Sequence, residues 1–320
     1  QKVINGILNP EILKEAEDEL NFVKNNNLQT YFITEEEYPQ RMIDCVDSPL
    51  LLYYKGTVDF NKQKVISIVG TRNSTRYGSD FCDNFLKELA VQYPDLLVIS
   101  GLAYGIDIMA PRGALANGLS TIGVLAHGLD RIYPTVHRQT AMEMVKHGGL
   151  LTEFPSKTEP DRFNFVRRNR IVAGMADAVL VIESNIKGGS LITAEIAISY
   201  CKYVFAFPGR VNDTRSEGCN KLIENNKAGI LISAEQFIRQ MNWGQESGKN
   251  GKVPKQQQLF FDLSPEETAI IDKLSQEGAM HIDQLAKKTE ISAFDLFSIL
   301  MNLEIRGIVS SLAGSFYELA

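Results

Sequence analysis

The sequence predicts an α/β protein with a doubly wound parallel sheet, a small helical region before the sheet and a winged-helix domain after it. Two observations predict the sheet: apolar runs of about five residues alternate with segments of helical periodicity, and glycine motifs stand directly after several runs. A third predicts the last domain, because three helical segments followed by a hairpin pattern are typical of a winged helix.

Changes in composition divide the chain into four parts. We expect a mostly helical N-terminal region at 1–60, the sheet domain at 61–243, a linker at 244–258 and the winged helix at 259–320. The linker is expected because its residues are mainly polar, include Gly and Pro, and show no apolar periodicity.

Local patterns predict the individual elements. Pro10 and apolar residues at helical spacing predict a helix over 9–25, whereas residues 30–60 give mixed signals, with one short strand expected at 50–54. Apolar runs predict strands at 65–69, 96–100, 121–125, 150–152, 178–182, 204–207 and 230–232. Helical spacing predicts helices at 78–91, 105–116, 138–146, 169–175, 190–200, 217–225, 265–274, 281–288 and 293–305.

Composition excludes several classes of protein. The chain is 44% hydrophobic, enough for a sizeable core, and no run approaches the ~18 apolar residues of a membrane span. No signal peptide is recognisable, and the four cysteines are scattered without a C-x-x-C pair, so we expect a cytoplasmic protein. The four histidines lack metal-ligand spacing, and we expect neither a metal nor a cofactor.

Charge is distributed unevenly along the chain. The net charge is −6, but residues 1–60 carry 5 basic and 11 acidic side chains, residues 61–243 carry 21 and 17, and residues 254–320 carry 5 and 10. The middle is therefore basic and both ends are acidic, so a polyanion is expected to bind the middle.

Three glycine motifs at predicted strand ends suggest phosphate-binding loops. The strongest is Lys187-Gly188-Gly189-Ser190, with Thr193 beyond it, because backbone N–H groups and the helix dipole at such a turn attract anions. Gly70-Thr71-Arg72 follows the first strand of the sheet domain, and Ser100-Gly101 follows the second. Asp107, near the second motif, is expected either to brace its loop or to contact the ligand. Ordinary strand–helix turns are the alternative interpretation, and the missing G-x-G-x-x-G spacing disfavours NAD.

An arginine cluster with interleaved aromatic residues precedes the strongest of these motifs. Its arginines and phenylalanines are Arg162, Phe163, Phe165, Arg167, Arg168 and Arg170, and no acidic residue stands among them. Guanidinium groups bind phosphates and aromatic rings stack on unpaired bases, so the pattern favours single-stranded nucleic acid over a solvated loop with phenylalanines in the core. Arg170 is the arginine expected to be internal and structural.

No catalytic arrangement is expected. His127 and His137 are expected in loops or at the surface, and the sequence shows no convincing Ser/His/Asp or Cys/His arrangement. Glu195, seven residues after Gly188, is a candidate general base near a phosphate loop, but a solvated or braced carboxylate is the favoured interpretation.

Together the motifs resemble the DNA-processing protein A family, also called DprA or Smf. The resemblance covers residues 65–230 and is carried by Val69–Arg72, Ser100–Asp107, His127–Pro134, Phe165–Ile171, Gly189–Ala194 and Phe207–Gly209. It implies an extended Rossmann-like fold that binds single-stranded DNA.

The resemblance also implies partners and a role. The family protects incoming single-stranded DNA, loads the RecA recombinase during natural transformation (competence), displaces single-strand-binding protein, works as a homodimer and is not an enzyme. The residues implied to line the DNA groove are Gly70, Thr71, Arg72, Ser100, Gly101, Phe165, Arg167, Lys187, Gly189, Ser190 and Thr193, to which the arginine cluster adds Arg168 and Arg170.

The winged helix is acidic where DNA-binding winged helices are usually basic. Its expected recognition helix, 292–305, contains Asp295 and Glu304 and no Lys or Arg. Since DNA would be repelled, we expect this domain to contact protein: its own sheet domain, a second subunit or a recombination partner. The same expectation holds for the acidic N-terminal region.

Two other functions compete with DNA binding. One is a nucleoside-monophosphate phosphoribohydrolase of the lysine-decarboxylase-like class, because residues 188–195 keep both glycines and the glutamate of its loop but lack the inner Gly-Thr. The other is a nucleotide-sensing module that signals through the winged helix. Release of a base would favour the enzyme, and tight binding of a mononucleotide would favour the sensor.

Overall fold

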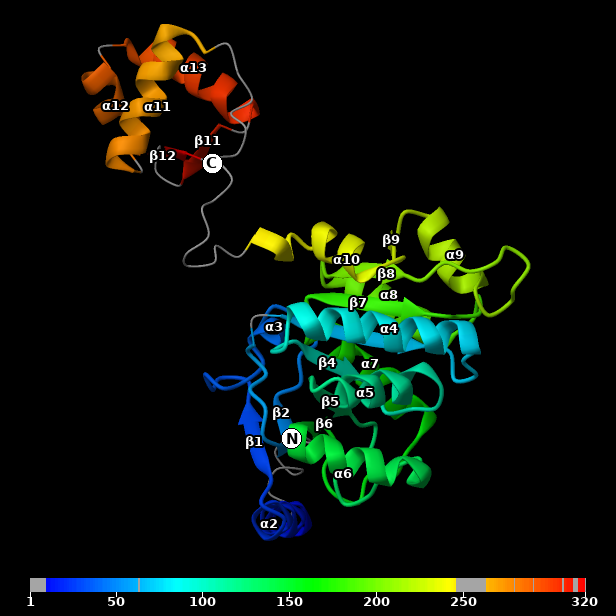
Figure 1. The fold of residues 1–320 in the computed structure, drawn as a ribbon. Helices are drawn as coiled ribbons and strands as arrows, with labels where there is room; N and C mark the ends of the chain where they lie inside the picture. The colour runs from blue at the N-terminus through cyan, green and yellow to red at the C-terminus, as the bar shows by residue number, and fades with distance from the viewer. Residues whose placement is uncertain are drawn as a thin grey trace. The chain divides into compact units, whose positions relative to one another are not determined.

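Figure 1 shows a computed structural model, which describes residues 10–62, 64–245, 263–278, 280–289, 291–306, 308–312 and 316–319. The chain forms two compact units, Gln1–Gln245 and Glu246–Ala320, each with a hydrophobic core of its own. The predicted linker, 244–258, lies largely outside the described residues, and its first two residues belong to the 3₁₀ helix η2, Trp243–Gln245.

The first unit is built on a nine-stranded sheet. Its strands are β1 Gln29–Phe32, β2 Leu51–Gly56, β3 Val65–Gly70, β4 Leu97–Ser100, β5 Ser120–Val124, β6 Gly148–Thr152, β7 Ala178–Ile182, β8 Tyr203–Ala206 and β9 Gly229–Ile230. They lie in the order β1-β2-β6-β5-β4-β3-β7-β8-β9, with β1 and β2 antiparallel and the rest parallel. The chain winds outward from β3 to β6 and then returns to place β7 beside β3. Ligands of such sheets bind where the winding reverses, at the carboxyl ends of the strands.

Helices cover both faces of this sheet (Figure 1). The helices described in this unit are α2 Pro10–Asn25, α3 Gln40–Ile43, α4 Arg76–Gln92, α5 Ile106–Ala116, η1 Thr135–His137, α6 Arg138–His147, α7 Arg162–Gly174, α8 Gly189–Ser199, α9 Glu217–Glu224 and α10 Ala234–Gln240. Helix α2 is mostly exposed and contributes no described residue to the core on either face. Val65 and Val69 of β3 share a core with α7, α8 and α9, whereas Ile66 and Ile68 share one with α4, α5 and α10. Because both faces are buried, the strand is apolar without alternation, which made it recognisable in the sequence.

The N-terminal region contains two strands as well as its helices. The expected short strand is β2, whereas β1 was not predicted, because its four residues mix polar and aromatic side chains and lie at the sheet edge. Arg41 ties this region to the centre: its Nε lies 2.6 Å from the Asp177 carboxylate, which also accepts the N–H of Val65 at 2.9 Å. Because β2 pairs with β6 and β1 pairs with β2, the two strands extend the central sheet at one edge.

Helix α7 begins seven residues before its expected start. The carboxylate of Asp161 caps it by accepting the N–H of Phe163 at 2.8 Å. Residues 162–168 have no apolar periodicity, so the sequence pattern alone did not extend the helix to Arg162. As a consequence, the arginine cluster lies on a helix and its members point in different directions. Helix α10, capped by Ser233, was not predicted either.

The second unit consists of three helices and a three-stranded sheet, the arrangement of a winged helix. Its elements are α11 Pro265–Glu277, β10 Met280–His281, α12 Ile282–Thr289, α13 Ala293–Ile305, β11 Val309–Leu312 and β12 Phe316–Leu319, with the sheet order β10-β12-β11. A capping box of Ser264 and Glu267 starts α11. In the described parts of both units, the helices are too short or too polar to span a membrane.

Candidate nucleic-acid interface

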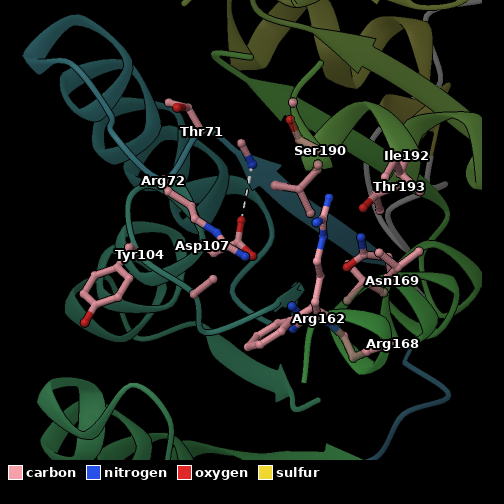
Figure 2. Close-up of a pocket in the computed structure, with 18 of the residues that line it drawn as sticks. Thr71, Arg72, Tyr104, Asp107, Arg162, Arg168, Asn169, Ser190, Ile192 and Thr193 are labelled. Atoms are coloured by element: carbon pink, nitrogen blue, oxygen red, sulfur yellow. Dashed lines mark hydrogen bonds between the residues drawn. The ribbon is translucent and has the colours of Figure 1, made fainter. Parts of the chain in front are cut away.

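A cavity of about 770 Å³ opens at the carboxyl ends of the parallel strands (Figure 2). Its walls come from the loops after β3, β4, β5, β6 and β7, from one face of α7 and from the first turn of α8. Residues around it thus lie on both sides of the point where the sheet winding reverses, which is where the topology places a ligand.

Nine of the thirteen predicted site residues line this cavity. They are Gly70, Thr71, Arg72, Phe165, Arg168, Lys187, Gly189, Ser190 and Thr193. The other four, Ser100, Gly101, Arg167 and Arg170, lie outside its lining. The cavity is also lined by residues that the sequence analysis did not select: Tyr104, Tyr133, Arg162, Asn169 and Ile192.

The N-terminus of α8 faces the cavity. Gly188 is its N-cap residue, and Gly188, Gly189 and Ser190 all belong to the cavity lining. The first N–H groups of a helix have no intrahelical acceptor and carry the positive end of its dipole, so they attract anions. Lys187 is exposed beside them and forms no ion pair with any described residue. This end of the cavity is therefore suited to a phosphate.

Arg72 supplies a second cation from the loop after β3. The N–H of Thr71 donates to the carbonyl of Glu183 at 2.7 Å, and its own carbonyl accepts the N–H of Ile106 at 3.1 Å, so the loop is held to both neighbouring segments. Arg72 itself is exposed, and its guanidinium lies 5.6 Å from the centre of the Phe165 ring. Such a contact presents a charged group and an aromatic face together.

Arg162 is a third cation without a partner in the described part of the chain. It stands in the first turn of α7, is exposed and lines the cavity. In Figure 2 its side chain extends from α7 toward Ser190. The sequence analysis placed it in the arginine cluster but not among the binding residues.

Arg168 lies at the base of the cavity and is only 3% exposed. Its guanidinium donates to the carbonyls of Gly101, at 2.6 Å, and Val124, and it faces the carboxylate of Asp107. Burial lowers the pKa of Arg168 to about 10, so it remains a cation at neutral pH. Arg168 thus joins the ends of β4 and β5.

Asp107 braces the loop after β3. It is buried, and its Oδ1 accepts the N–H of Gly70 at 3.3 Å. Burial raises the pKa of Asp107, and the charge of Arg168 opposes that rise. Asp107 therefore braces the loop after β3, and it also lines the cavity.

Two predicted glycines are required by packing. A Cβ on Gly70 would lie 2.0 Å from the carbonyl oxygen of Ile182, and one on Gly101 would lie 2.4 Å from Nη1 of Arg168. Ser100 is buried, and its hydroxyl donates to the carbonyl of Ile68 at 2.7 Å. Gly101 and Ser100 therefore support the cavity from behind its lining.

Arg167 and Arg170 point away from the cavity, onto a different face of α7. Both reach the buried carboxylate of Glu153, at 2.7 Å and 2.5 Å. Arg170 also donates to the carbonyl of Asp47, which agrees with its expected structural role. Together they line a separate, shallow depression of about 400 Å³ beside residues 47–51.

His127 lies in the loop after β5, as expected, whereas His137 ends the 3₁₀ helix η1, and both side chains are buried. His127 is 1% exposed and His137 is 3% exposed. Nδ1 of His137 lies 2.9 Å from the carbonyl of Leu102, and Nε2 of His127 accepts the N–H of Tyr133 at 3.2 Å. Both therefore support loops of the cavity wall.

Comparison with known proteins places the chain in a family. The family model for DNA recombination-mediator protein A matches residues 29–242, and the model for the DprA winged helix domain matches residues 254–315. The chain belongs to the DNA recombination-mediator protein A family.

Relatives in this family include several curated proteins. The chain is 36% identical over 219 residues to DNA processing protein DprA of Bacillus subtilis, covering 68% of this chain and 73% of the relative. It is 30% identical over 313 residues to Protein Smf of Escherichia coli, covering 96% of this chain and 81% of the relative.

Solved structures of the family have a similar fold. DprA from Streptococcus pneumoniae matches with a TM-score of 0.64 and 32% identity, covering 72% of this chain and 82% of the other. DprA from Helicobacter pylori, whose structure describes a single-stranded DNA binding mode, matches with a TM-score of 0.61 and 29% identity, covering 68% and 96%.

The cavity-lining tyrosines that the sequence analysis did not select had weak local signals. Tyr104 stands inside a glycine motif, and Tyr133 precedes a proline, so each is explained by its loop alone. Their position in one cavity depends on β4 and β5 being neighbours, which no local pattern indicates.

Proposed function

We propose that this chain binds single-stranded DNA in the cavity at the strand ends. The observation that carries the proposal is the convergence in one cavity of the N-terminus of α8 and three exposed cations, Arg72, Arg162 and Lys187, which form no ion pair with a described residue. Phosphates bind to such groups, and the exposed aromatic rings beside them accept unpaired bases. The single-stranded DNA binding mode described for the Helicobacter pylori relative supports the same ligand.

The proposed binding mode predicts how the affinity for DNA depends on salt concentration and on base sequence. Each cation that neutralises a phosphate of a single strand contributes about −0.7 to the slope of log Kobs against log salt, so three cations give a slope of about −2. Stacking on aromatic rings tolerates every base, and we therefore expect little sequence preference. A duplex hides its base faces and should bind more weakly.

Fluorescence anisotropy of labelled oligo(dT), against a duplex and at several salt concentrations, tests this function. Arg72→Ala and Lys187→Ala should each weaken binding by about tenfold, the effect of losing one charge-assisted hydrogen bond. Arg76→Ala is the matched control, because Arg76 is exposed, pairs with Asp80 on α4 and does not line the cavity. Absence of binding at low salt, or an affinity independent of salt, would contradict the proposal.

We further propose that the chain acts as a recombination mediator rather than as an enzyme. It would protect incoming single-stranded DNA, displace single-strand-binding protein and load RecA recombinase during natural transformation, as a homodimer in the cytoplasm. Membership of the recombination-mediator family supports this role. RecA strand exchange on DNA coated with single-strand-binding protein, with and without the chain, tests it; equal rates would contradict it.

The alternative hydrolase receives little support from the geometry. Glu195, the candidate general base, lies outside the cavity lining, and its carboxylate pairs with Lys227 at 2.7 Å. Incubation with nucleoside monophosphates and chromatography for released base distinguishes this alternative from DNA binding.

A further inference from the structure

The strand order places the two exposed tyrosines of the cavity away from two of its exposed cations. Tyr133 follows β5 and Tyr104 follows β4, whereas Arg72 follows β3 and Lys187 follows β7. Since these strands are neighbours in the order β5-β4-β3-β7, the tyrosines lie toward one end of the cavity and Arg72 and Lys187 toward the other. Phe165 of α7 lies between the two ends, because its ring is near both Arg72 and Tyr133.

The two tyrosine rings are exposed although they line a cavity. Tyr104 is 49% exposed and Tyr133 is 46% exposed. Tyr104 rests edge-on against the buried ring of His137, with centroids 5.2 Å apart, and Tyr133 lies 6.1 Å from Phe165 in a tilted arrangement. In the part of the chain that the structure describes, neither hydroxyl has a hydrogen-bond partner. Rings held in this way keep apolar surface available to a ligand.

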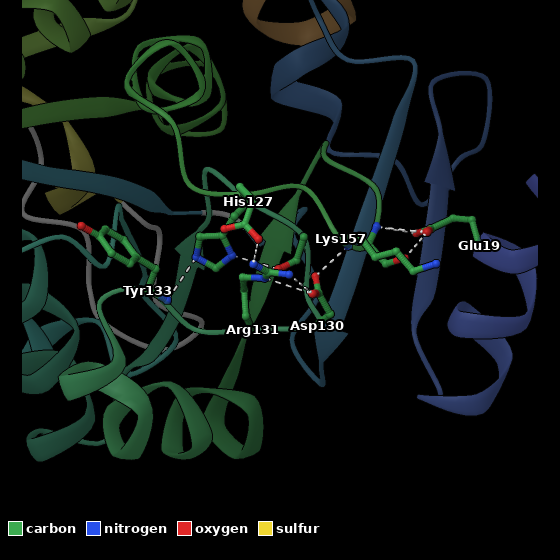
Figure 3. A network of polar contacts seen from close by, with 9 residues as sticks. Glu19, His127, Asp130, Arg131, Tyr133 and Lys157 are labelled. Carbon is green, nitrogen blue, oxygen red and sulfur yellow. Dashed lines mark hydrogen bonds and ion pairs between the residues drawn. The ribbon is translucent and has the colours of Figure 1, made fainter. Parts of the chain in front are cut away.

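Tyr133 is positioned by a polar network (Figure 3). Its N–H donates to Nε2 of His127, and Nδ1 of that ring lies 2.9 Å from the carbonyl of Gly128. Asp130, in the same loop, accepts the N–H of Lys157 at 3.0 Å and pairs with Arg131 at 2.9 Å. The loop that carries Tyr133 is therefore fixed from both sides, and a ligand does not have to order it.

We propose that Tyr104 and Tyr133 contact the bases and set the orientation of the strand in the cavity. The inference rests on the proposed DNA-binding function. The backbone lies over β3 and β7, where Arg72 and Lys187 hold phosphates, and the bases point over β4 and β5 toward the two tyrosines. Phe165 separates the phosphate side from the base side.

The test compares a strand that has bases with one that lacks them. Tyr104→Ala and Tyr133→Ala are measured by anisotropy on labelled oligo(dT) and on an abasic oligonucleotide with the same number of phosphates. We expect each substitution to weaken binding of oligo(dT) by about tenfold, as for loss of one base–aromatic stack, and to leave binding of the abasic strand unchanged. Tyr104→Phe and Tyr133→Phe keep the rings and should bind as the wild type does. Tyr203→Ala is the control, because Tyr203 is 61% exposed at the amino end of β8, away from the cavity.

Equal losses on both strands, or no loss on oligo(dT) while the wild type binds it, would overturn the inference and leave the proposed function standing. A wild-type chain that binds neither strand would overturn the proposed function instead. A second measurement is independent of folding effects: ultraviolet crosslinking of 5-iodouracil-containing DNA should label the peptides of Tyr104 and Tyr133. Crosslinks confined to other parts of the chain would also overturn it.

Discussion

At the scale of single residues, two arginines of the same cavity have different physical roles. Arg72 is exposed and lies over the ring of Phe165, whereas Arg168 is buried, bonded to two carbonyls and beside Asp107. Burying a cation costs free energy unless an opposite charge or hydrogen bonds compensate for the lost water, and the buried carboxylate of Asp107 needs the charge of Arg168 for the same reason. Burial thus distinguishes the structural arginine, Arg168, from Arg72, which is exposed and available to the proposed ligand.

Replacement of these arginines should separate stability from affinity. We expect Arg168→Ala to lower the free energy of unfolding by roughly 3 kcal/mol, because Asp107 would remain buried without its neighbouring charge. Arg72→Ala should leave that free energy unchanged and weaken DNA binding. Urea unfolding and anisotropy on the same preparations measure both quantities. An Arg168→Ala chain as stable as the wild type would show that Arg168 is not a structural brace.

His127 should make the stability of the chain depend on pH. Burial lowers the pKa of His127 below 6.5, although Asp130 opposes this and Arg131 adds to it. The folded ring then stays neutral while the unfolded chain takes up a proton, so stability falls as the pH drops through 6.5 toward the folded pKa and is unaffected above it. Urea unfolding at about pH 7.5 and about pH 5 should show this loss in the wild type.

Two histidine variants separate the contribution of His127 to this pH dependence from that of other groups. His127→Asn should lose part of the pH dependence, whereas His147→Asn, which changes an exposed histidine at the end of α6, should retain it. Identical slopes in the wild type and His127→Asn would contradict the argument.

At the scale of elements, the periodicity of α7 decides which cluster residues meet the cavity. Phe165, Arg168 and Val172 are three and four residues apart and all line the cavity, while Arg167 and Arg170 pair with Glu153 on another face of the helix.

The two adjacent glycines at the start of α8, Gly188 and Gly189, have different surroundings. A Cβ on Gly188 would lie 2.2 Å from Oγ of Ser184, but one on Gly189 would have no atom within 4 Å.

Alanine at these two glycines should therefore have different effects. Gly188→Ala should lower both thermal stability and DNA affinity, because the loop must shift. Gly189→Ala should keep the melting temperature, since its methyl group meets open space, but weaken binding, since the proposed phosphate would approach through that space. Thermal unfolding with anisotropy distinguishes the two. Wild-type affinity in Gly189→Ala would exclude a phosphate at the start of α8.

At the scale of the whole molecule, the two units carry different surfaces. The basic residues of the sheet unit include the three exposed cations of the cavity, Arg72, Arg162 and Lys187. In the winged-helix unit, α13 exposes Phe297 and Met301, at 56% and 55%, and residues 292–305 contain no Lys or Arg. These features favour a protein contact over a DNA contact for the second unit, which stays a prediction.

A chain that ends at Gln245 should therefore retain DNA binding. Its core and its cavity belong to the first compact unit. We expect its affinity for oligo(dT) to agree with that of the full chain within about threefold, a difference below 1 kcal/mol. Anisotropy on both proteins measures this. A much larger loss would assign part of the DNA site to the winged-helix unit.

The sequence by itself determined the alternation of strands and helices in the sheet unit and the position of the glycine motifs at strand ends. It could do so because strands buried on both faces are continuous apolar runs, and because tight turns into helices require glycine. Gly70, Arg72, Lys187 and Ser190 were therefore predicted as site residues from these motifs, and all four line the cavity.

Only the tertiary structure decided which of these side chains share a cavity. Strand β7 returns to β3, and β5 lies next to β4, through pairings between distant segments that no local pattern indicates. The same packing buried Arg168, turned Arg167 and Arg170 toward Glu153, and brought Tyr104 and Tyr133 to one end of the cavity. Local sequence patterns follow the backbone of each element, whereas the direction of a side chain depends on what the other elements leave open.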